Sequence, residues 1–226
     1  MTSKIPILIP IKEHSKRCQK KNYSLLPYTA NYLLNLGLNE MACVITDSKG
    51  LRELAIELNL KSHLEVRNLQ QDELTSCWNY AISKNFDAFF LCPVTQPFRS
   101  NNLIFRMLDL FEKEFDKWDF ITTVSTVQDR SQYFIYTIGN NYCFVNESKN
   151  RKGNDCKNVS MIDGALYLIK TSFLKTVIKS KDQNETFWNG KFTCIENEVP
   201  FMDIDTEYDM QKFDFLREYF NRLMLI

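Results

Sequence analysis

The first half of the chain alternates short apolar runs with segments whose apolar residues recur at helical spacing. The clearest helical pattern combines Leu51, Leu54, Ala55 and Leu58. The runs that predict strands, rich in apolar or β-branched residues, are Ile5–Ile11, Ala42–Thr46, a short one near Leu64–Val66, Phe86–Cys92 and Phe120–Val127. The helices expected between them are Pro27–Leu36, ended by Gly37, a second around Leu51–Leu58, and others over about Asp72–Asn85 and Asn101–Glu114. These repeated β–α–β units predict an α/β fold with a mainly parallel, Rossmann-like sheet and helices on both faces.

The second half departs from this pattern. Residues 128–162, which we call the arm, are polar and aromatic, with an Asn-rich turn at Asn140-Asn141, and we expect a hairpin that projects from the main sheet. The elements expected after it are a strand over Ala165–Ile169, a helix over Thr171–Lys179, a strand over Val199–Ile204 and a last helix with Phe213, Leu216, Phe220 and Leu223 on one stripe. We therefore expect residues 1–226 to form one domain with a small arm.

Composition excludes several classes of protein. Lys plus Arg and Asp plus Glu both total 28, so the chain lacks the basic excess typical of a nucleic-acid-binding protein. No apolar run approaches the ~18 residues that span a bilayer, and no signal-peptide core is evident at the N-terminus. Seven Cys occur without a CxxC pair and beside only two His, so we expect reduced thiols, no zinc site and a cytoplasmic location.

A cluster of cations follows the first expected strand. Between Lys12 and Asn22 lie Lys12, Lys16, Arg17, Lys20 and Lys21, together with Ser15. Ligands of open parallel sheets bind beyond the C-terminal ends of the strands, so such a loop suits a triphosphate. A solvated surface loop is the more ordinary interpretation from charge alone. The chain has no GxxxxGK[ST] or GxGxxG run, so a phosphate grip here depends on side chains.

Two aspartates precede the last expected helix. In a strand, Asp203 and Asp205 point to one face, where two carboxylates and substrate phosphate oxygens can share a Mg²⁺ ion. A structural interpretation is equally available. Thr206 is a suitable N-cap for the helix, and acidic residues near it favour the positive end of the helix dipole.

Both ends of the chain resemble the acylneuraminate cytidylyltransferases, the CMP-sialic acid synthetases. Their N-terminal signature matches Ile9, Pro10, Ser15, Lys16, Lys21 and Asn22, with Lys12 in place of an Arg. Their Asp-Ile-Asp-Thr-Glu-x-Asp motif matches Asp203 through Asp209. The resemblance implies a nucleotidyltransferase fold of the GT-A-like type, CTP phosphates held by Lys12, Ser15, Lys16, Lys21 and Asn22, and Mg²⁺ held by Asp203 and Asp205. It also implies a homodimer that packs through the arm.

Weaker matches lie between these motifs. Arg67 and Thr75 resemble a stretch that lies near the nucleotide in the family, although the interval from Arg67 to Asp72 is two residues shorter here. Thr95 matches a motif near the sugar, where Pro93 replaces the Gln that faces the sugar and Gln96 is its expected substitute. Asp163 stands for an Asn of the family in Asp163-Gly164-Ala165, so Thr95, Gln96 and Asp163 are the expected sugar-binding residues.

The function expected from these features is transfer of CMP from CTP to the anomeric hydroxyl of an acidic 2-keto sugar, with release of pyrophosphate. Lys21, Lys12 and Asp205 are the expected catalytic residues, and catalysis is expected to depend on positioning and electrostatics. Two alternatives stay open. One is a glycosyltransferase that uses Asp203-Ile204-Asp205 as a DxD metal motif, and the other is a non-catalytic relative that binds nucleotide without turnover.

Overall fold

The computed structural model describes residues 5–13, 18–68, 71–127, 135–138, 141–144 and 159–223. Sixteen helices and strands, besides a short 3-10 turn at Asn39–Met41, follow one another in these ranges: β1 (Ile7–Ile11), α1 (Lys21–Asn35), β2 (Ala42–Thr46), α2 (Lys49–Glu57), β3 (Lys61–Leu64), α3 (Glu73–Ser83), β4 (Ala88–Leu91), α4 (Leu103–Lys113), β5 (Phe120–Val127), β6 (Ile135–Ile138), β7 (Asn141–Phe144), β8 (Val159–Lys170), α5 (Thr171–Ile178), α6 (Gln183–Trp188), β9 (Phe192–Glu196) and α7 (Glu207–Leu223). Among the described residues, no helix is long and apolar enough to cross a membrane.

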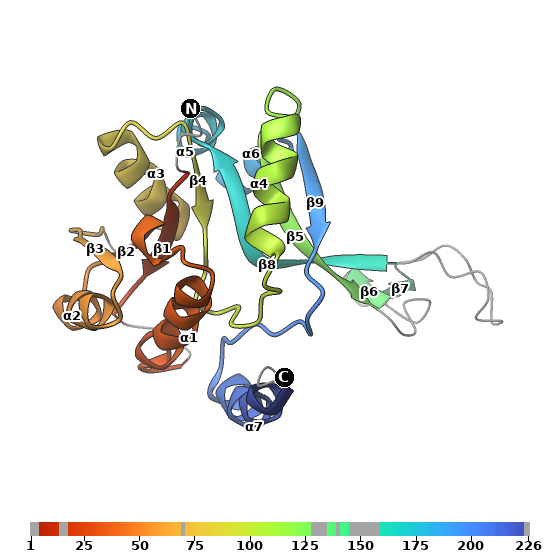
Figure 1. Ribbon diagram of the computed structural model, residues 1–226. Helices are drawn as coiled ribbons and strands as arrows, with labels where there is room; N and C mark the ends of the chain where they lie inside the picture. Colours follow the sequence, from red (N-terminus) through yellow and green to blue (C-terminus); the bar gives the residue numbers. More distant parts are fainter. Residues whose placement is uncertain are drawn as a thin grey trace.

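Seven strands form one sheet in the order β3-β2-β1-β4-β8-β5-β9 (Figure 1). Strand β8 runs antiparallel to both of its neighbours, β4 and β5, and the other pairs of this sheet are parallel. The mainly parallel α/β fold expected from the sequence is therefore confirmed. The carboxyl ends of β1, β2 and β4 open toward one edge, where an α/β sheet binds its ligands.

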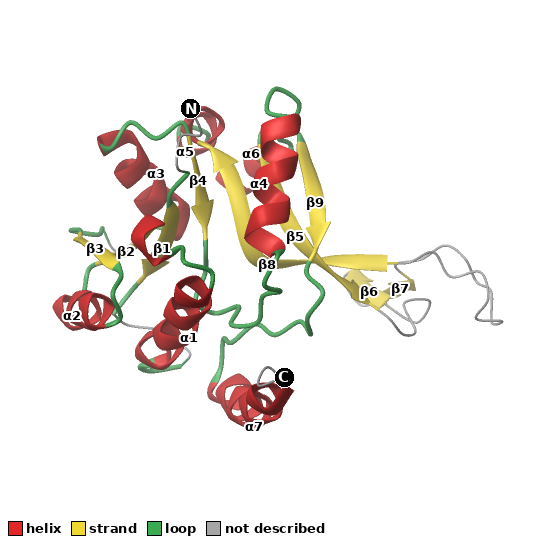
Figure 2. Ribbon diagram, in the orientation of Figure 1, coloured by secondary structure: helices red, strands yellow, loops and turns green. Residues whose placement is uncertain are grey.

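Helices cover both faces of the sheet (Figure 2). Side chains alternate along β1, so Ile7, Ile9 and Ile11 enter one hydrophobic cluster while Leu8 enters the other. The first cluster packs against α1, α2, α4 and α7. The second packs against α3, α5 and α6. This arrangement leaves the residues beyond the strand ends to line the site.

Helix α1 begins six residues earlier than the sequence predicted. Lys20 adopts a left-handed conformation with φ 60°, and its carbonyl accepts the N–H groups of Tyr23 and Ser24, which starts the helix at Lys21. Pro27 therefore lies inside the helix, where its missing N–H leaves one helical hydrogen bond unmade. Gly37 ends the helix as expected, with φ +67°. The early start places Lys21 in the first turn, beside the end of β1.

The segment before α7 is not the strand predicted over Val199–Ile204. The strand in this part of the chain is β9, which pairs with β5 and was not predicted, and neither was α6. Residues 200–205 cross back toward the end of β4, where the N–H of Ile204 donates to the carbonyl of Thr95 at 2.9 Å. Alternation still holds here, because Ile204 is fully buried and Asp203 is exposed.

Part of the arm forms a hairpin as predicted. Strands β6 and β7 pair antiparallel in a separate two-stranded sheet, seen beside the main body in Figure 1. Strand β8 starts within the arm and continues into the main sheet over twelve residues, so the strand predicted at Ala165–Ile169 is its second half. Gly164 has φ +68° where the pairing of β5 with β8 shifts register. Dimerisation through the arm stays a prediction.

The described cysteines are all free thiols. Cys18, Cys43, Cys77 and Cys92 are buried, and Cys194 is exposed. Cys143 and Cys156 lie where side chains are not described.

Candidate active site

A pocket of about 290 Å³ lies beyond the ends of β1 and β4. Its described lining residues are Pro10, Lys12, Lys21, Asn22, Glu73, Pro93, Val94, Thr95, Asp203 and Asp205. We call it the small pocket. It brings together residues of the two sequence motifs, one after the first strand and one before the last helix.

Lys21 is the centre of the small pocket. Its side chain is only 9% exposed, and its Nζ donates to the carbonyl of Ile204 at 2.8 Å and to Oδ1 of Asp205 at 3.2 Å. Asp205 is 33% exposed, so the pair lies at the pocket wall and not in the deep core. The position of Lys21 at the start of α1 also adds the positive end of the helix dipole to its own charge.

Asn22 and Lys12 fix the start of the basic loop. The side-chain amide of Asn22 donates to the carbonyl of Lys12 at 2.6 Å, and Asn22 is 8% exposed. Lys12 lines both this pocket and a larger one next to it. Ser15 and Lys16, expected to bind phosphate, lie outside the described residues. The structure therefore brings three of the five expected phosphate-binding residues together.

Asp203 and Asp205 both line the small pocket, one on each side of buried Ile204. The structural interpretation of this motif also holds, because Thr206 and Asp209 form a capping box at α7. The N–H of Asp209 donates to the Thr206 hydroxyl at 3.2 Å, and Oδ2 of Asp209 accepts the N–H groups of Thr206 and Asp205 at 2.9 and 3.2 Å. The Thr206 hydroxyl and these N–H groups lower the pKa of Asp209. The cap thus anchors the backbone of Asp205.

These two carboxylates suit a magnesium ion. Mg²⁺ commonly uses one or two carboxylates together with substrate phosphates, and Asp203 and Asp205 face the same pocket as Lys12 and Lys21. No group of three or more His, Cys, Asp or Glu capable of holding a metal occurs among the described residues. A metal here therefore needs ligands from a bound substrate as well.

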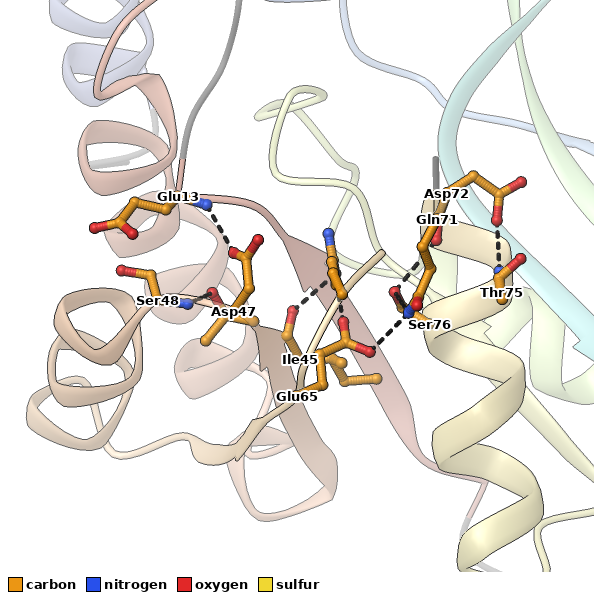
Figure 3. A network of polar contacts seen from close by, with 11 residues as sticks. Glu13, Ile45, Asp47, Ser48, Glu65, Gln71, Asp72, Thr75 and Ser76 are labelled. Carbon is orange, nitrogen blue, oxygen red and sulfur yellow. Dashed lines mark hydrogen bonds and ion pairs between the residues drawn. The ribbon is translucent and has the colours of Figure 1, made fainter. Parts of the chain in front are cut away.

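Figure 3 shows Ile45, Glu65 and Gln71 in a network of polar contacts across the ends of β2 and β3 and the start of α3, and the network includes contacts of Arg67. Its side chain, 3% exposed, pairs with Glu65 and donates to the carbonyl of Ile45 at 3.3 Å. Glu65 also accepts from the amide of Gln71 at 3.0 Å. Nη1 of Arg67 is buried with no partner among the described residues. That leaves one guanidinium nitrogen with unused hydrogen-bonding capacity at the ends of β2 and β3.

Thr75 lies in the first turn of α3, where its N–H donates to Oδ1 of the N-cap Asp72 at 2.7 Å. Figure 3 shows Asp72 and Thr75 beside Gln71 and Ser76 at this helix start. Thr75 is not among the described residues that line either pocket. Nucleotide binding by Arg67 and Thr75 stays a prediction.

The larger neighbouring pocket, which we call the large pocket, measures about 660 Å³. Its described lining residues are Lys12, Asp72, Glu73, Leu74, Leu91, Pro93, Thr95, Gln96, Gly164, Tyr167, Gln183, Asn184, Phe187, Trp188 and Asp203. Thr95 and Gln96, two of the three residues expected to bind sugar, lie here. Five residues line both pockets, namely Lys12, Glu73, Pro93, Thr95 and Asp203.

Asp163 lies elsewhere, in a buried polar cluster. Its Oδ1 accepts the Thr123 hydroxyl and the N–H of Ala165, and its Oδ2 accepts the Ser125 hydroxyl and the amide of Asn197. Asp163 is 3% exposed and is absent from the described lining of both pockets. The neighbouring Gly164 lines the large pocket instead. Sugar binding by Asp163 stays a prediction, while its structural role is evident.

Several lining residues were not found from the sequence. Glu73 follows the N-cap of α3, and Tyr167 points from β8. Four more, Gln183, Asn184, Phe187 and Trp188, belong to α6, a six-residue helix capped by Asp182, whose Oδ1 accepts the N–H of Glu185 at 2.9 Å. A helix this short has no repeating apolar pattern, so only the cap was a usable signal.

The protein resembles solved nucleotidyltransferase structures. CMP:2-keto-3-deoxy-manno-octonic acid synthetase complexed with CTP superimposes with a TM-score of 0.71 at 12% identity, over 96% of this chain and 99% of that one. A cytidylyltransferase from Leptospira borgpetersenii serovar Hardjo-bovis gives 0.63 at 17% identity, over 92% and 83% of the two chains. The 4-diphosphocytidyl-2C-methyl-D-erythritol synthase from Anaerococcus prevotii gives 0.61 at 12% identity, over 92% and 95%.

The sequence alone does not place the chain in a family. No protein-family model matches it, and no curated protein sequence matches it. The structural likeness, at 12–17% identity in these three cases, shows the fold and no more. The protein therefore has a nucleotidyltransferase-like α/β fold, with its candidate site at the carboxyl ends of the parallel strands.

Proposed function

We propose that the protein is a magnesium-dependent cytidylyltransferase that transfers CMP from CTP to a sugar hydroxyl and releases pyrophosphate. The observation that carries this proposal is the contact between Lys21 and Asp205, which are 184 residues apart in the sequence. They meet in the pocket that Lys12 and Asp203 also line. Cations for a triphosphate and carboxylates for a hard metal ion thus lie in one place. The choice of CTP, and of an acidic 2-keto sugar as the first acceptor to test, follows from the sequence resemblance.

The reaction is an in-line displacement at the α-phosphorus of CTP. The anomeric oxygen of the acceptor forms the new bond, and the bond from the α-phosphorus to the oxygen bridging to the β-phosphorus breaks. The electron pair of the broken bond leaves with pyrophosphate. The proton of the acceptor hydroxyl passes to Asp205 or to solvent. Such a reaction requires chiefly positioning and stabilisation of negative charge.

Lys21, in the small pocket, and Lys12, in both pockets, supply that stabilisation. Lys21 is held by Ile204 and Asp205, so its ammonium group is already oriented before the nucleotide binds. Lys12 lies where the two pockets meet, beside both the phosphates and the acceptor. Asn22 holds the backbone of Lys12 by its bond to the Lys12 carbonyl. A lysine at this position provides charge without the bidentate geometry of an arginine.

Magnesium would be held by Asp203 and Asp205 and would neutralise charge on the phosphates. The capping box of Thr206 and Asp209 holds the backbone of Asp205 in place for this role. Lys21 reduces the repulsion between these carboxylates and the incoming triphosphate, because it contacts Asp205 directly.

The test is pyrophosphate release from CTP with Mg²⁺ and a panel of 2-keto sugar acids, including 2-keto-3-deoxy-manno-octonic acid. CTP, ATP, GTP and UTP are compared in the same assay. We expect Asp205→Asn to lose pyrophosphate release while it keeps the fold. The matched control is Asp214→Asn, because Asp214 lies on the exposed side of α7 and lines neither pocket among the described residues.

Three outcomes contradict the proposal. Unchanged turnover in Asp205→Asn would remove the metal assignment. Hydrolysis of nucleotide-sugar donors without CTP consumption would favour a glycosyltransferase. Thermal stabilisation by CTP with no pyrophosphate from any acceptor would indicate a protein that binds nucleotide without turnover.

A further inference from the structure

The charged residues that line the large pocket affect which charge on an acceptor is favoured there. Its described lining includes three carboxylates, Asp72, Glu73 and Asp203, against a single cation, Lys12. In the proposed reaction, Asp203 holds magnesium and Lys12 faces the phosphates. Asp72 already caps α3 through its bond to the N–H of Thr75. Glu73 is left as the charged group that an acceptor meets.

Glu73 is an acidic group of the pocket wall with cations nearby. Protein atoms around its carboxyl displace water and raise its pKa, although Arg67, Lys12 and Lys21 act in the opposite direction. The side chain is exposed and lines the large pocket. An acceptor carboxylate beside Glu73 would meet like charge, whereas an ammonium group would gain a partner.

Tyr167 also lines the large pocket and lies in the field of nearby carboxylates. Burial raises the pKa of its phenol, and the carboxylates of Asp163, Asp203 and Glu73 raise it further. Tyr167, Phe187 and Trp188 together give this pocket an aromatic lining. Aromatic rings and a carboxylate are the surroundings that proteins use to bind organic cations.

Gln96 indicates independently that the large pocket holds a polar ligand. It is 8% exposed and lines the pocket, and its side-chain amide has no hydrogen-bond partner among the described residues. A side-chain amide that faces a pocket takes its hydrogen bonds from water or from a ligand. Gln96 thus provides a hydrogen-bond donor and a hydrogen-bond acceptor for a sugar hydroxyl in the pocket that Glu73 also lines.

We propose that the acceptor carries a protonated amino group that binds against Glu73, within the wall formed by Tyr167, Phe187 and Trp188. This inference rests on the proposed function and specifies the substrate class of its acceptor site. An amino sugar meets the requirement, and so does a sugar acid that also carries an amine, with its carboxylate turned toward Lys12. Glu73 is then the specificity-determining residue of the acceptor site.

The experiment compares three hexoses of similar size by saturation-transfer NMR on the full chain, at a pH where the amine is protonated. Glucosamine carries an ammonium group, glucose is neutral and glucuronate carries a carboxylate. We expect glucosamine to bind about tenfold more tightly than the other two, since a charge-assisted hydrogen bond is worth about that factor. Glu73→Gln should remove the preference, and Glu73→Lys should shift it to glucuronate. The matched control is Glu53→Gln, on the exposed side of α2, which should keep the wild-type preference.

The inference is overturned if wild-type protein binds the three hexoses equally or binds none of them. It is also overturned if glucosamine stays preferred in Glu73→Gln. Its failure is distinguishable from failure of the proposed function, because CTP with Mg²⁺ stabilises the wild-type protein only if the nucleotide site exists. Stabilisation by CTP without a preference for glucosamine leaves the cytidylyltransferase proposal intact.

Discussion

The small pocket and the large pocket are built differently, although they share five residues. The small pocket joins charged residues that sit in short sequence motifs beside β1 and α7. The large pocket takes most of its remaining wall from three elements: Leu74 from α3, Gly164 and Tyr167 from β8, and Gln183, Asn184, Phe187 and Trp188 from α6. Binding a triphosphate requires dense charge, which recurring motifs can supply. Selecting an acceptor requires shape, which only the assembled fold defines.

The largest predicted effect is the loss of CTP-dependent activity when the Lys21 ammonium group in the small pocket is removed. Lys21→Met keeps a chain of similar length but removes the cation beside Asp205. We expect CTP-dependent pyrophosphate release to fall by about 100-fold or more, the usual cost of losing one preorganised charge-stabilising donor. Binding of glucosamine, measured by saturation-transfer NMR, should persist.

The control for this change is Lys113→Met, because Lys113 is 68% exposed on α4 and pairs only with Asp109 among the described ion pairs. Turnover should be unaltered there. If Lys21→Met loses CTP-dependent release and glucosamine binding together, the two pockets do not act as separate sites.

A variant of Asp163 tests whether this part of β8 serves the acceptor pocket or only the stability of the fold. The carboxylate accepts hydrogen bonds from Thr123, Ser125, Ala165 and Asn197. In Asp163→Asn, the new amide must face either the N–H of Ala165 or the amide of Asn197, so two donors oppose each other in either orientation. We expect a loss of about 2–3 kcal/mol in the free energy of unfolding, measured by urea denaturation.

A role in sugar binding gives the opposite result for the same variant. The free energy of unfolding would stay near that of the wild type, and the affinity for the acceptor would fall. Ser160→Ala is the control, because Ser160 is an exposed residue of the same strand.

The sequence predicted the bounds of helices and strands correctly where a residue pattern is typical of only one kind of element. Ala42–Thr46 and Phe120–Val127 are strands with the predicted bounds, because both are rich in β-branched residues. The start of α1 was mispredicted because Pro27 is typical of a first turn, whereas a left-handed Lys20 sets the start. Such backbone conformations carry no strong signal unless a glycine marks them.

Only some residues of the candidate site were predicted from the sequence. Lys21, Asn22, Asp203 and Asp205 were found because their motifs are contiguous. Glu73 was not, since a Glu after an N-cap is ordinary in the first turn of any helix. Its importance arises only when α3 is placed against β1, which brings it beside Lys12 in both pockets. The spacing of residues along the sequence does not indicate that α3 packs against β1.

The smallest predicted effect concerns the N-cap Thr206. It lies in the motif that is interpreted both as a helix cap and as a metal site. Thr206→Ala removes the hydroxyl that accepts the N–H of Asp209 and donates to its Oδ2. We expect the free energy of unfolding to fall by about 1 kcal/mol, as for other N-caps. Because Asp209 also holds the N–H of Asp205, the Mg²⁺ concentration that supports half-maximal turnover should rise. Asp182→Ala removes a comparable cap from α6 and should lower stability without that shift in Mg²⁺ dependence. An equal shift in both variants would mean that the change in Mg²⁺ dependence follows from lost stability and not from the position of Asp205.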